Sequence, residues 1–204
     1  MFLRPAATRP AFMTVGLLRS CIVCLAIGGA GMAGAATLEG QRFDDAVRLA
    51  DQPLRLNGVG VRAVMFIKGY VAGLYLHEKA ASLQDMVGMQ GAKRLQLRML
   101  HGAAPEDFNK ALVSGIRKNS SEGEFARLQA RMGQLEQTIV SIGGIRKGDV
   151  IDFDYVPELG TTLSVNGAGK GPAIAGADFY AAVLGIFVGE HPVDARLKRG
   201  LLGQ

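Results

Sequence analysis

The histidines and cysteines are the residues best suited to bind a metal, and their spacing argues against a metal centre. The chain has three histidines, and His77, His101 and His191 lie far apart in it. Zinc sites usually combine such ligands at short, regular spacing. Cys21 and Cys24 have the CxxC spacing of a redox or zinc motif, but both lie in an N-terminal segment that we expect to be removed. We therefore expect no metal site and no cofactor.

Motifs for nucleotide binding and covalent catalysis are also missing from the sequence. The chain has no GxxxxGK loop followed by Ser or Thr, and no GxSxG turn. Gly58 and Gly60 lack the third glycine of a dinucleotide-binding fingerprint, and no strand–helix–strand pattern surrounds them. Basic residues are scattered and balanced by acidic ones, so no surface interleaves basic and aromatic residues. We therefore expect no nucleic acid as a partner.

The N-terminal segment has the order of a secretory signal. Its charged residues are Arg4, Arg9 and Arg19, and it has no acidic residue. A short apolar stretch over residues 21–27 follows, and small residues end the segment. A basic head, an apolar middle and a small-residue end are what export requires. We therefore predict a signal peptide over residues 1–36.

Signal peptidase favours small residues at the third and the last position before the cut, which Ala33-Gly34-Ala35 or Gly34-Ala35-Ala36 would supply. Met13 is an alternative start, because residues 13–36 alone make a complete signal. A membrane anchor is the other interpretation, but the apolar stretch is short of the roughly 20 residues that span a bilayer, and it is rich in glycine. We predict a mature domain over residues 37–204, located in the periplasm.

Removal of the leader changes the composition of what remains. Both cysteines would be lost, which suits a compartment that oxidises exposed thiols. The formal net charge would fall from +5 to +2, because Arg4, Arg9 and Arg19 all lie in the leader. The mature chain contains no other apolar run long enough to span a membrane. We therefore expect no stable membrane span after cleavage.

Apolar residues that alternate with polar ones predict a series of short strands. We expect residues 61–76 to form two strands separated at Lys68-Gly69, and we expect a hairpin between residues 150–156 and 161–165. Asn57-Gly58 and Gly60 indicate a tight turn or a bulge. The remaining predicted strands lie over residues 37–43, followed by a polar stretch to Gln52, and over residues 54–56, 95–99 and 171–174.

Helical periodicity predicts five helices, of which the one over residues 104–119 has the clearest ends. Pro105 lies at its start and acidic residues follow, while Arg117 and Lys118 end it, so the charges complement the helix dipole. Two long helices interrupt the strands and two more follow them, which favours an α+β domain with an antiparallel sheet covered on one face by helices. The other predicted helices lie over residues 82–89, 122–140, 178–188 and 193–202.

Four stretches of the mature chain, taken in order, form a recognisable pattern. They are Leu56-Asn57-Gly58-Val59-Gly60-Val61-Arg62, Phe66-Ile67-Lys68-Gly69-Tyr70-Val71-Ala72-Gly73-Leu74-Tyr75-Leu76, Pro105-Glu106-Asp107-Phe108, and the tail over residues 180–189 with 197–203. Together they resemble the chalcone isomerase-like family, over essentially all of the mature chain. The resemblance implies an open-faced β-sandwich, in which helices cover one face of an antiparallel sheet and a ligand lies between the layers.

The resemblance also implies roles for single residues. In the isomerases of this family an arginine after the Gly-Val pair helps to activate the chalcone, and Arg62 occupies that place. The threonine, tyrosine and asparagine of the isomerase pocket fall on Tyr70, Phe108 and Gly115. Phe108 has no hydroxyl and Gly115 has no side chain, so donors that would stabilise a transition state are lost. We therefore favour a non-catalytic, exported bacterial member over an enzyme.

The leading hypothesis is a periplasmic, non-catalytic protein that binds a small hydrophobic ligand such as a fatty or aromatic carboxylate. Arg62 would anchor the carboxylate, because a guanidinium in apolar surroundings presents a planar fork of donors. Either Tyr70 or Tyr75 would donate a second hydrogen bond, since the two point to opposite faces of a regular strand. The apolar part of the ligand would lie against Phe108, Leu112 and Phe179.

Two alternatives stay open. In the first, the protein is an isomerase or intramolecular lyase that acts through Arg62 on another enone-type substrate. In the second, it is a structural or interaction module whose cleft is filled by its own side chains. Arg62 would then form a buried ion pair, for example with Glu78 or Asp154. The sequence identifies neither a ligand nor a protein partner.

Overall fold

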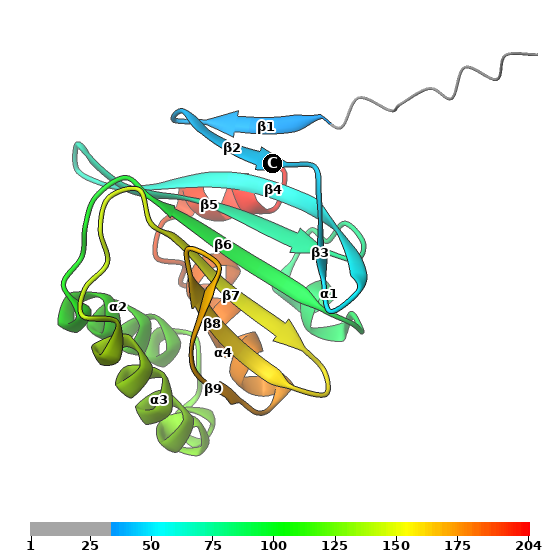
Figure 1. Ribbon diagram of the computed structural model, residues 1–204. Helices are drawn as coiled ribbons and strands as arrows, with labels where there is room; N and C mark the ends of the chain where they lie inside the picture. The colour runs from blue at the N-terminus through cyan, green and yellow to red at the C-terminus, as the bar shows by residue number, and fades with distance from the viewer. Residues whose placement is uncertain (1–33) are drawn as a thin grey trace, which may run out of the picture. The chain divides into compact units, whose positions relative to one another are not determined.

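Alternating apolar and polar residues form a seven-stranded antiparallel sheet in the computed structural model, which describes residues 34–204 (Figure 1). Each strand pairs with the next one along the chain, so the sheet is a meander from β3 to β9. The predicted hairpin of β7 with β8 is confirmed, with Tyr155 opposite Thr161. The strands are β3 Ala46–Leu49, β4 Gln52–Val64, β5 Ile67–Leu76, β6 Lys93–Met99, β7 Val150–Val156, β8 Gly160–Val165 and β9 Ala168–Ile174.

A separate two-stranded hairpin precedes the sheet. It consists of β1, Ala35–Leu38, and β2, Gln41–Asp44. Phe43 of β2 is fully buried, and a Cβ added to Gly73 of β5 would clash with its ring, so the hairpin packs against the sheet where a glycine leaves room. The predicted signal peptide, residues 1–36, lies outside the described residues except for its last three positions. Two of those positions, Ala35 and Ala36, belong to β1.

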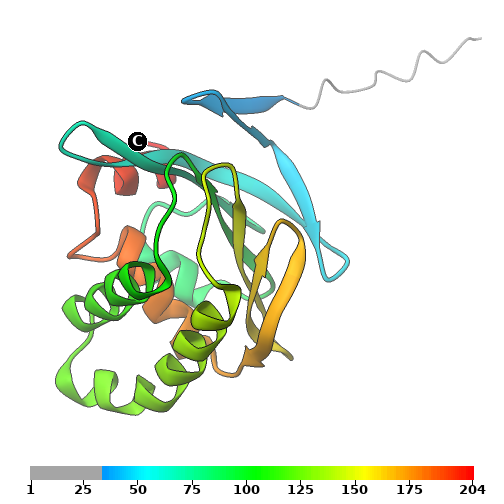
Figure 2. The ribbon, with the colours of Figure 1, turned by 60° about the vertical axis from the view of Figure 1, so that its left-hand side comes forward.

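Five helices lie against the face of the sheet opposite the β1–β2 hairpin (Figures 1 and 2). Their number and approximate positions match the prediction, and α2 begins at Pro105 as expected. Within residues 34–204, none of the helices is both long and apolar enough to cross a membrane. The helices are α1 Leu83–Gly88, α2 Pro105–Lys118, α3 Glu122–Ile142, α4 Ala177–Val188 and α5 Ala195–Leu201.

Polar side chains fix where several helices begin. The backbone N–H of Asp85 donates to Ser82 Oγ at the start of α1, at 3.1 Å. At the start of α3, Glu124 N donates to Ser121 Oγ at 3.3 Å, while Ser121 N donates to Glu124 Oε2 at 2.8 Å. This reciprocal pair is a capping box, which satisfies donors that the first helical turn leaves free. The caps explain why the predicted helix starts agree with the structure.

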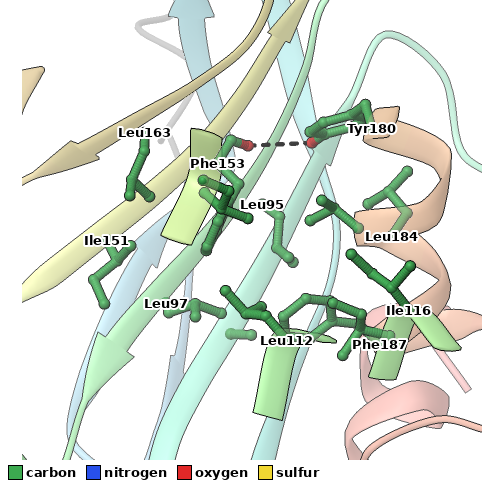
Figure 3. Close-up of a cluster of buried hydrophobic side chains, with 14 of the residues drawn as sticks. Leu95, Leu97, Leu112, Ile116, Ile151, Phe153, Leu163, Tyr180, Leu184 and Phe187 are labelled. Atoms are coloured by element: carbon green, nitrogen blue, oxygen red, sulfur yellow. Dashed lines mark hydrogen bonds between the residues drawn. The ribbon is translucent and has the colours of Figure 1, made fainter. Parts of the chain in front are cut away.

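Apolar side chains fill the space between the sheet and the helices (Figure 3). The Tyr180 hydroxyl donates to the carbonyl oxygen of Phe153 at 3.2 Å, so even the polar end of this buried ring has a partner. The cluster combines sheet residues with residues of α2 and α4. Those drawn in Figure 3 include Leu95, Leu97, Ile151, Phe153, Leu163, Leu112, Ile116, Tyr180, Leu184 and Phe187.

The predicted break at Lys68-Gly69 is wrong. The chain turns at Met65-Phe66 instead, and Lys68 is already within β5, opposite Ala63. No glycine, proline or asparagine marks this turn, so the usual local signals could not locate it. A second difference concerns the residues before Gln52, where the structure forms a hairpin turn at Glu39-Gly40 and an additional strand, β3.

A turn or a bulge was predicted near Asn57-Gly58, and the structure has a bulge there. Strand β4 runs without interruption from Gln52 to Val64, and its register against β5 shifts between Leu56 and Gly58. A bulge inserts one residue and locally increases the strand twist. The glycines of this segment therefore lie within a bulged strand and do not form a turn that reverses the chain.

Candidate functional site

Arg62 and Tyr70 lie together, as expected of a shared site. Arg62 on β4 is directly opposite Tyr70 on β5, so both side chains point to the helix-covered face. The guanidinium carbon of Arg62 is 5.8 Å from the centre of the Tyr70 ring. At this distance the cation is attracted to the face of the aromatic ring. The pair is the polar part of the candidate site.

The other three predicted residues lie in the buried core, in the same cluster as Tyr70. Phe108, Leu112 and Phe179 are 9%, 4% and 0% exposed. The Phe108 ring stacks on Phe153 with a centroid distance of 6.5 Å. These side chains are thus occupied by packing between the sheet and the helices.

A different aromatic residue of α4 reaches the Arg62–Tyr70 pair. The rings of Tyr70 and Phe187 make an edge-to-face contact, with centroids 6.5 Å apart. Phe179 lies eight positions earlier in α4, which is roughly 12 Å along a helix that rises 1.5 Å per residue. Phe187, which the sequence prediction did not include, is the residue of α4 that makes the aromatic contact with Tyr70. Periodicity places both residues on buried faces but does not show which end of α4 meets β5.

The guanidinium of Arg62 has an unsatisfied donor. Its Nε is buried and has no hydrogen-bond partner among the described residues. The ion pairs considered from the sequence are not formed: Asp154 is bound by Arg94, with Nε to Oδ1 and Nη2 to Oδ2 both at 2.6 Å, and Glu78 is exposed. A buried donor without a partner costs about 1–3 kcal/mol, and more when the group is charged. A ligand that offered a hydrogen-bond acceptor to the Arg62 Nε–H group would therefore be stabilised here.

Asp194 and Tyr70 set the electrostatics around Arg62. Asp194 lies at the start of α5, and its Oδ2 accepts from the backbone N–H of Ala63 at 3.2 Å. Burial raises the pKa of Tyr70, and the nearby Arg62 partly opposes that rise. The phenol therefore stays protonated at neutral pH and can donate a hydrogen bond. A guanidinium and a neutral hydroxyl side by side are suited to an anion.

The glycines before Arg62 allow α5 to approach β4. A Cβ on Gly60 would lie 2.5 Å from the carbonyl oxygen of Leu197, and one on Gly58 would lie 2.7 Å from that of Leu201. Real Cβ atoms do not make such close contacts with backbone. Both glycines are thus required by the docking of α5 on β4.

Asn57 adds hydrogen bonds to the contact between β4 and α5. Its side-chain Nδ2 donates to the carbonyl oxygens of Ala80 and Leu201 at 3.0 and 2.7 Å, and its Oδ1 accepts from Ala80 N at 2.8 Å. The residue is only 3% exposed, so these bonds replace those it would make with water. The docking of α5 therefore accounts for Asn57 and Gly58, and no ligand is needed to explain these residues.

The position where the isomerases carry asparagine has a packing role here. A Cβ on Gly115 of α2 would lie 2.7 Å from Ile186 Cγ2, so this glycine lets α2 and α4 approach each other. Phe108 is also committed to the core, through its stack on Phe153. Neither position presents a polar group to a substrate. The geometry thus gives no specific support to the isomerase alternative.

Hollows in the described part of the chain lie elsewhere. Five of them have volumes between about 290 and about 680 Å³. The largest lies between β1, residues 55–59 of β4 and the C-terminal Gly200 and Gly203. None of the five is lined by Arg62 or by the other four predicted residues. The Arg62 Nε atom is itself buried in this conformation.

The opposite face of the sheet holds a second polar cluster. Besides the Arg94–Asp154 pair, the side-chain amide of Gln96 donates to Asp152 Oδ1 at 2.8 Å. Burial raises the pKa of Asp154, and the bound Arg94 opposes that rise. Each charge in this cluster has a partner, so we assign it to strand pairing. In residues 34–204 no group of three or more His, Cys, Asp or Glu side chains is placed to hold a metal ion.

Comparisons with known proteins agree with this architecture. No curated protein matches the chain. Among solved structures, a fatty-acid binding protein of Arabidopsis thaliana matches with a TM-score of 0.62 and 14% sequence identity, over 83% of this chain and 96% of the plant chain. A protein-family profile described as chalcone isomerase-like matches residues 35–203, which include the whole sheet and all five helices. The chain therefore belongs to the chalcone isomerase-like family.

Proposed function

We propose that the protein is a non-catalytic binder of a small hydrophobic carboxylate, such as a fatty acid, and that Arg62 binds the carboxylate group. The observation that carries the proposal is the buried Nε of Arg62, which has no partner among the described residues. A carboxylate would supply the missing acceptor, because the guanidinium fork and a carboxylate match in geometry. The plant protein of the same fold is described as fatty-acid binding, which supports this class of ligand.

The apolar tail of such a ligand would lie where Tyr70 meets Phe187. This place adjoins Arg62, and both rings are buried, at 7% and 2% exposure. Because side chains fill the gap, a tail can enter only if Phe187 changes rotamer or α5 moves away from β4. The tail would replace one set of apolar contacts with another. The carboxylate would satisfy the donor that the unliganded protein leaves unpaired.

We also propose that binding takes place in the periplasm. This rests on the order of charges and small residues in the segment 1–36, which is that of an export signal. Cell fractionation with an antibody to the domain tests this location. Detection of the protein only in the cytoplasm, with the segment uncleaved, would contradict it.

Displacement of a fluorescent fatty acid by dodecanoate tests the ligand proposal. We expect residues 34–204 to bind the probe, and Arg62→Ala to weaken dodecanoate binding by about ten- to a hundredfold, as expected from a lost hydrogen bond to a charged group. Arg62→Lys should give an intermediate loss, since it keeps the charge without the fork. The control is Arg48→Ala, which removes an exposed arginine of β3. Equal binding by the Arg62 and Arg48 variants would overturn the proposal.

A second candidate is an interaction module that holds no ligand. The observation that favours it is the filled core, in which Phe108, Leu112 and Phe179 are packed and none of the five hollows reaches Arg62. This candidate predicts that protein purified from its own cell yields no lipid on extraction. Mass spectrometry of that extract separates the two functions, because a binder should carry a stoichiometric amphiphile.

A further inference from the structure

The turn between β4 and β5 exposes four consecutive large apolar side chains. Val64, Met65, Phe66 and Ile67 are 55%, 85%, 97% and 58% exposed. Figures 1 and 2 both show this turn reaching beyond the neighbouring strand ends. Single exposed apolar residues are common, but a contiguous group on a projecting turn indicates a contact surface. We call residues 64–67 the apolar tip.

The other hairpin turns of the described chain are built differently. Each contains a polar residue or a glycine, as turn geometry favours. Those turns are Glu39-Gly40, Ala50-Asp51, Glu158-Leu159 and Asn166-Gly167. The apolar tip is thus a departure from the way this chain makes its turns.

The backbone of the tip would accommodate glycine better than the residue it has. Met65 has a φ of +54°, in the left-handed region that side chains with a Cβ rarely adopt. Other turns of this chain also place non-glycine residues in this region, and among the described residues at positive φ Met65 is the one with a large apolar side chain. The others are Glu39, Ala50, Asp51 and Asn166, at +51°, +47°, +60° and +53°. A large apolar side chain at Met65 is therefore kept against the local conformational preference. A role for the side chain itself would explain this.

The shape of the tip favours a lipid surface over a protein surface. Val64 and Ile67 are the last pair of the ladder, and Met65 and Phe66 project beyond them. Phe66 is almost fully exposed, so it is uncovered on every side and not along one flat face. A protein surface would cover one side of such a tip, whereas the boundary between headgroups and acyl chains surrounds whatever enters it. Insertion by about 5–10 Å is typical of such contacts.

Cationic residues border the tip on both strands. Lys68 follows Ile67, its side chain is 51% exposed, and its Nζ donates to Glu39 Oε2 at 2.6 Å. Arg62 precedes Val64 by two positions, which is about 7 Å along a strand. Lys68 is suited to the phosphates of lipid headgroups once a phosphate oxygen takes the place of Glu39.

We propose that the apolar tip inserts into the interface of a phospholipid bilayer. The insertion itself depends only on residues 64–67. Its purpose rests on the proposed function: insertion would place Arg62 about 7 Å below the tip, near the level at which a fatty carboxylate lies in a membrane. The ligand would then pass between the bilayer and Arg62 without crossing bulk water.

Tryptophan fluorescence tests the insertion, because the chain contains no tryptophan. Residues 34–204 are used, since they contain all of the residues 35–203 that match the family profile. In Phe66→Trp, we expect vesicles of phosphatidylcholine and phosphatidylglycerol in equal amounts to shift the emission to the blue. Brominated acyl chains should quench it.

The matched control is Leu159→Trp, which places the same probe in the β7–β8 turn at a residue that is 54% exposed. Its emission should not respond to the vesicles. An unchanged Phe66→Trp spectrum, or the same shift in both variants, would overturn the proposal. A protein partner for the tip would give the first of these results.

Flotation of the double variant Met65→Ser/Phe66→Ser provides an independent readout. Both positions are exposed, so the fold should persist, and we expect at least about a tenfold loss of vesicle binding from the apolar surface removed. Binding of dodecanoate in solution should be unchanged in this variant, whereas Arg62→Ala should lose it and still float with vesicles. Failure of the membrane proposal and failure of the ligand proposal therefore give different results. Full vesicle binding by the double variant would contradict insertion.

Discussion

The two ends of the segment from Leu56 to Arg62 differ in how their polar groups are satisfied. At one end, Asn57 makes three hydrogen bonds to Ala80 and Leu201 and is almost completely buried. At the other end, the buried Nε of Arg62 has no partner in the described chain. We call the Asn57 end closed, because its side chain has its hydrogen-bond partners, and the Arg62 end, five positions later in the strand, open.

One sequence pattern thus serves two purposes in this strand. Asn57 and the glycines after it hold α5 against β4, so changes there should act on stability. The side chain of Arg62 forms no hydrogen bond or salt bridge with a described residue, only the contact with the Tyr70 ring, so its replacement should act mainly on binding. Buried polar groups without partners are rare in native proteins, and they often mark a place where another molecule binds. The predictions below separate these purposes.

The largest effect is expected where α5 meets β4 most closely. Gly60→Val would place a branched side chain against the backbone of Leu197, and overpacking of this kind costs about 3 kcal/mol. Denaturant unfolding of residues 34–204 measures the loss. The control is Gly169→Val on β9, where an added Cβ meets nothing within 4 Å. If the two variants are equally stable, α5 does not dock as described.

A smaller loss is expected when the hydrogen bonds of the closed end are removed. Asn57→Ala leaves Ala80 N, Ala80 O and Leu201 O without their partner, and unsatisfied buried groups cost about 2 kcal/mol. The free energy of unfolding should fall by this amount, and backbone amides near Ala80 should exchange faster with solvent. An unchanged exchange rate at Ala80 would show that water replaces the side chain at no cost.

The cap of α5 should make stability depend on pH. Burial on its own would raise the pKa of Asp194, but hydrogen bonds from the first turn of α5 and from Ala63 N outweigh it and lower the pKa from 3.8. The charged carboxylate therefore stabilises the fold above pH 3.8, and this contribution is lost as the pH falls through the lowered value.

Asp194→Ala should therefore cost about 1 kcal/mol at neutral pH, which is typical of a lost helix cap. Unfolding measured across a pH series should show the difference from the parent protein narrowing in acid. A difference that stays constant down to the most acidic sample would mean that the charge of Asp194 has no part in it.

The smallest effect on stability is expected at the open end. Arg62→Leu removes a guanidinium that forms no salt bridge with a described residue, so the free energy of unfolding should change by less than about 1 kcal/mol or rise slightly. The matched comparison is Arg94→Leu, which leaves the buried Asp154 without its partner and should cost about 3 kcal/mol. Equal losses in the two variants would show that Arg62 is a structural residue after all.

Much of the fold could be predicted because local signals agree with the final structure. Ser82 and Pro105 mark helix starts, and strict alternation over residues 150–156 marks a strand with the correct partner. The β4–β5 turn could not be predicted, because Met65 and Phe66 carry apolar side chains where turns usually carry polar ones. Contact with a membrane would explain why this turn has apolar residues in place of the usual polar ones.

The candidate site was less predictable than the fold. The pattern around Arg62 pointed to the correct strand and to Tyr70, because residues opposite each other on neighbouring strands must meet. The contact of Phe187 with Tyr70 was not predicted, since sequence periodicity does not tell which turn of α4 reaches Tyr70. The exact packing of Phe108 and Leu112 depends on volumes contributed by several elements, which a single sequence does not reveal.

The state of the Arg62 Nε–H group can be observed directly by NMR. Arginine labelled with heavy nitrogen gives one Nε–H signal for each slowly exchanging guanidinium, and the signal that disappears in Arg62→Lys belongs to Arg62. We predict that dodecanoate shifts this signal while that of Arg94, already bound to Asp154, stays in place. An Arg62 signal that does not move at saturating dodecanoate would contradict the assignment of Arg62 as the carboxylate anchor.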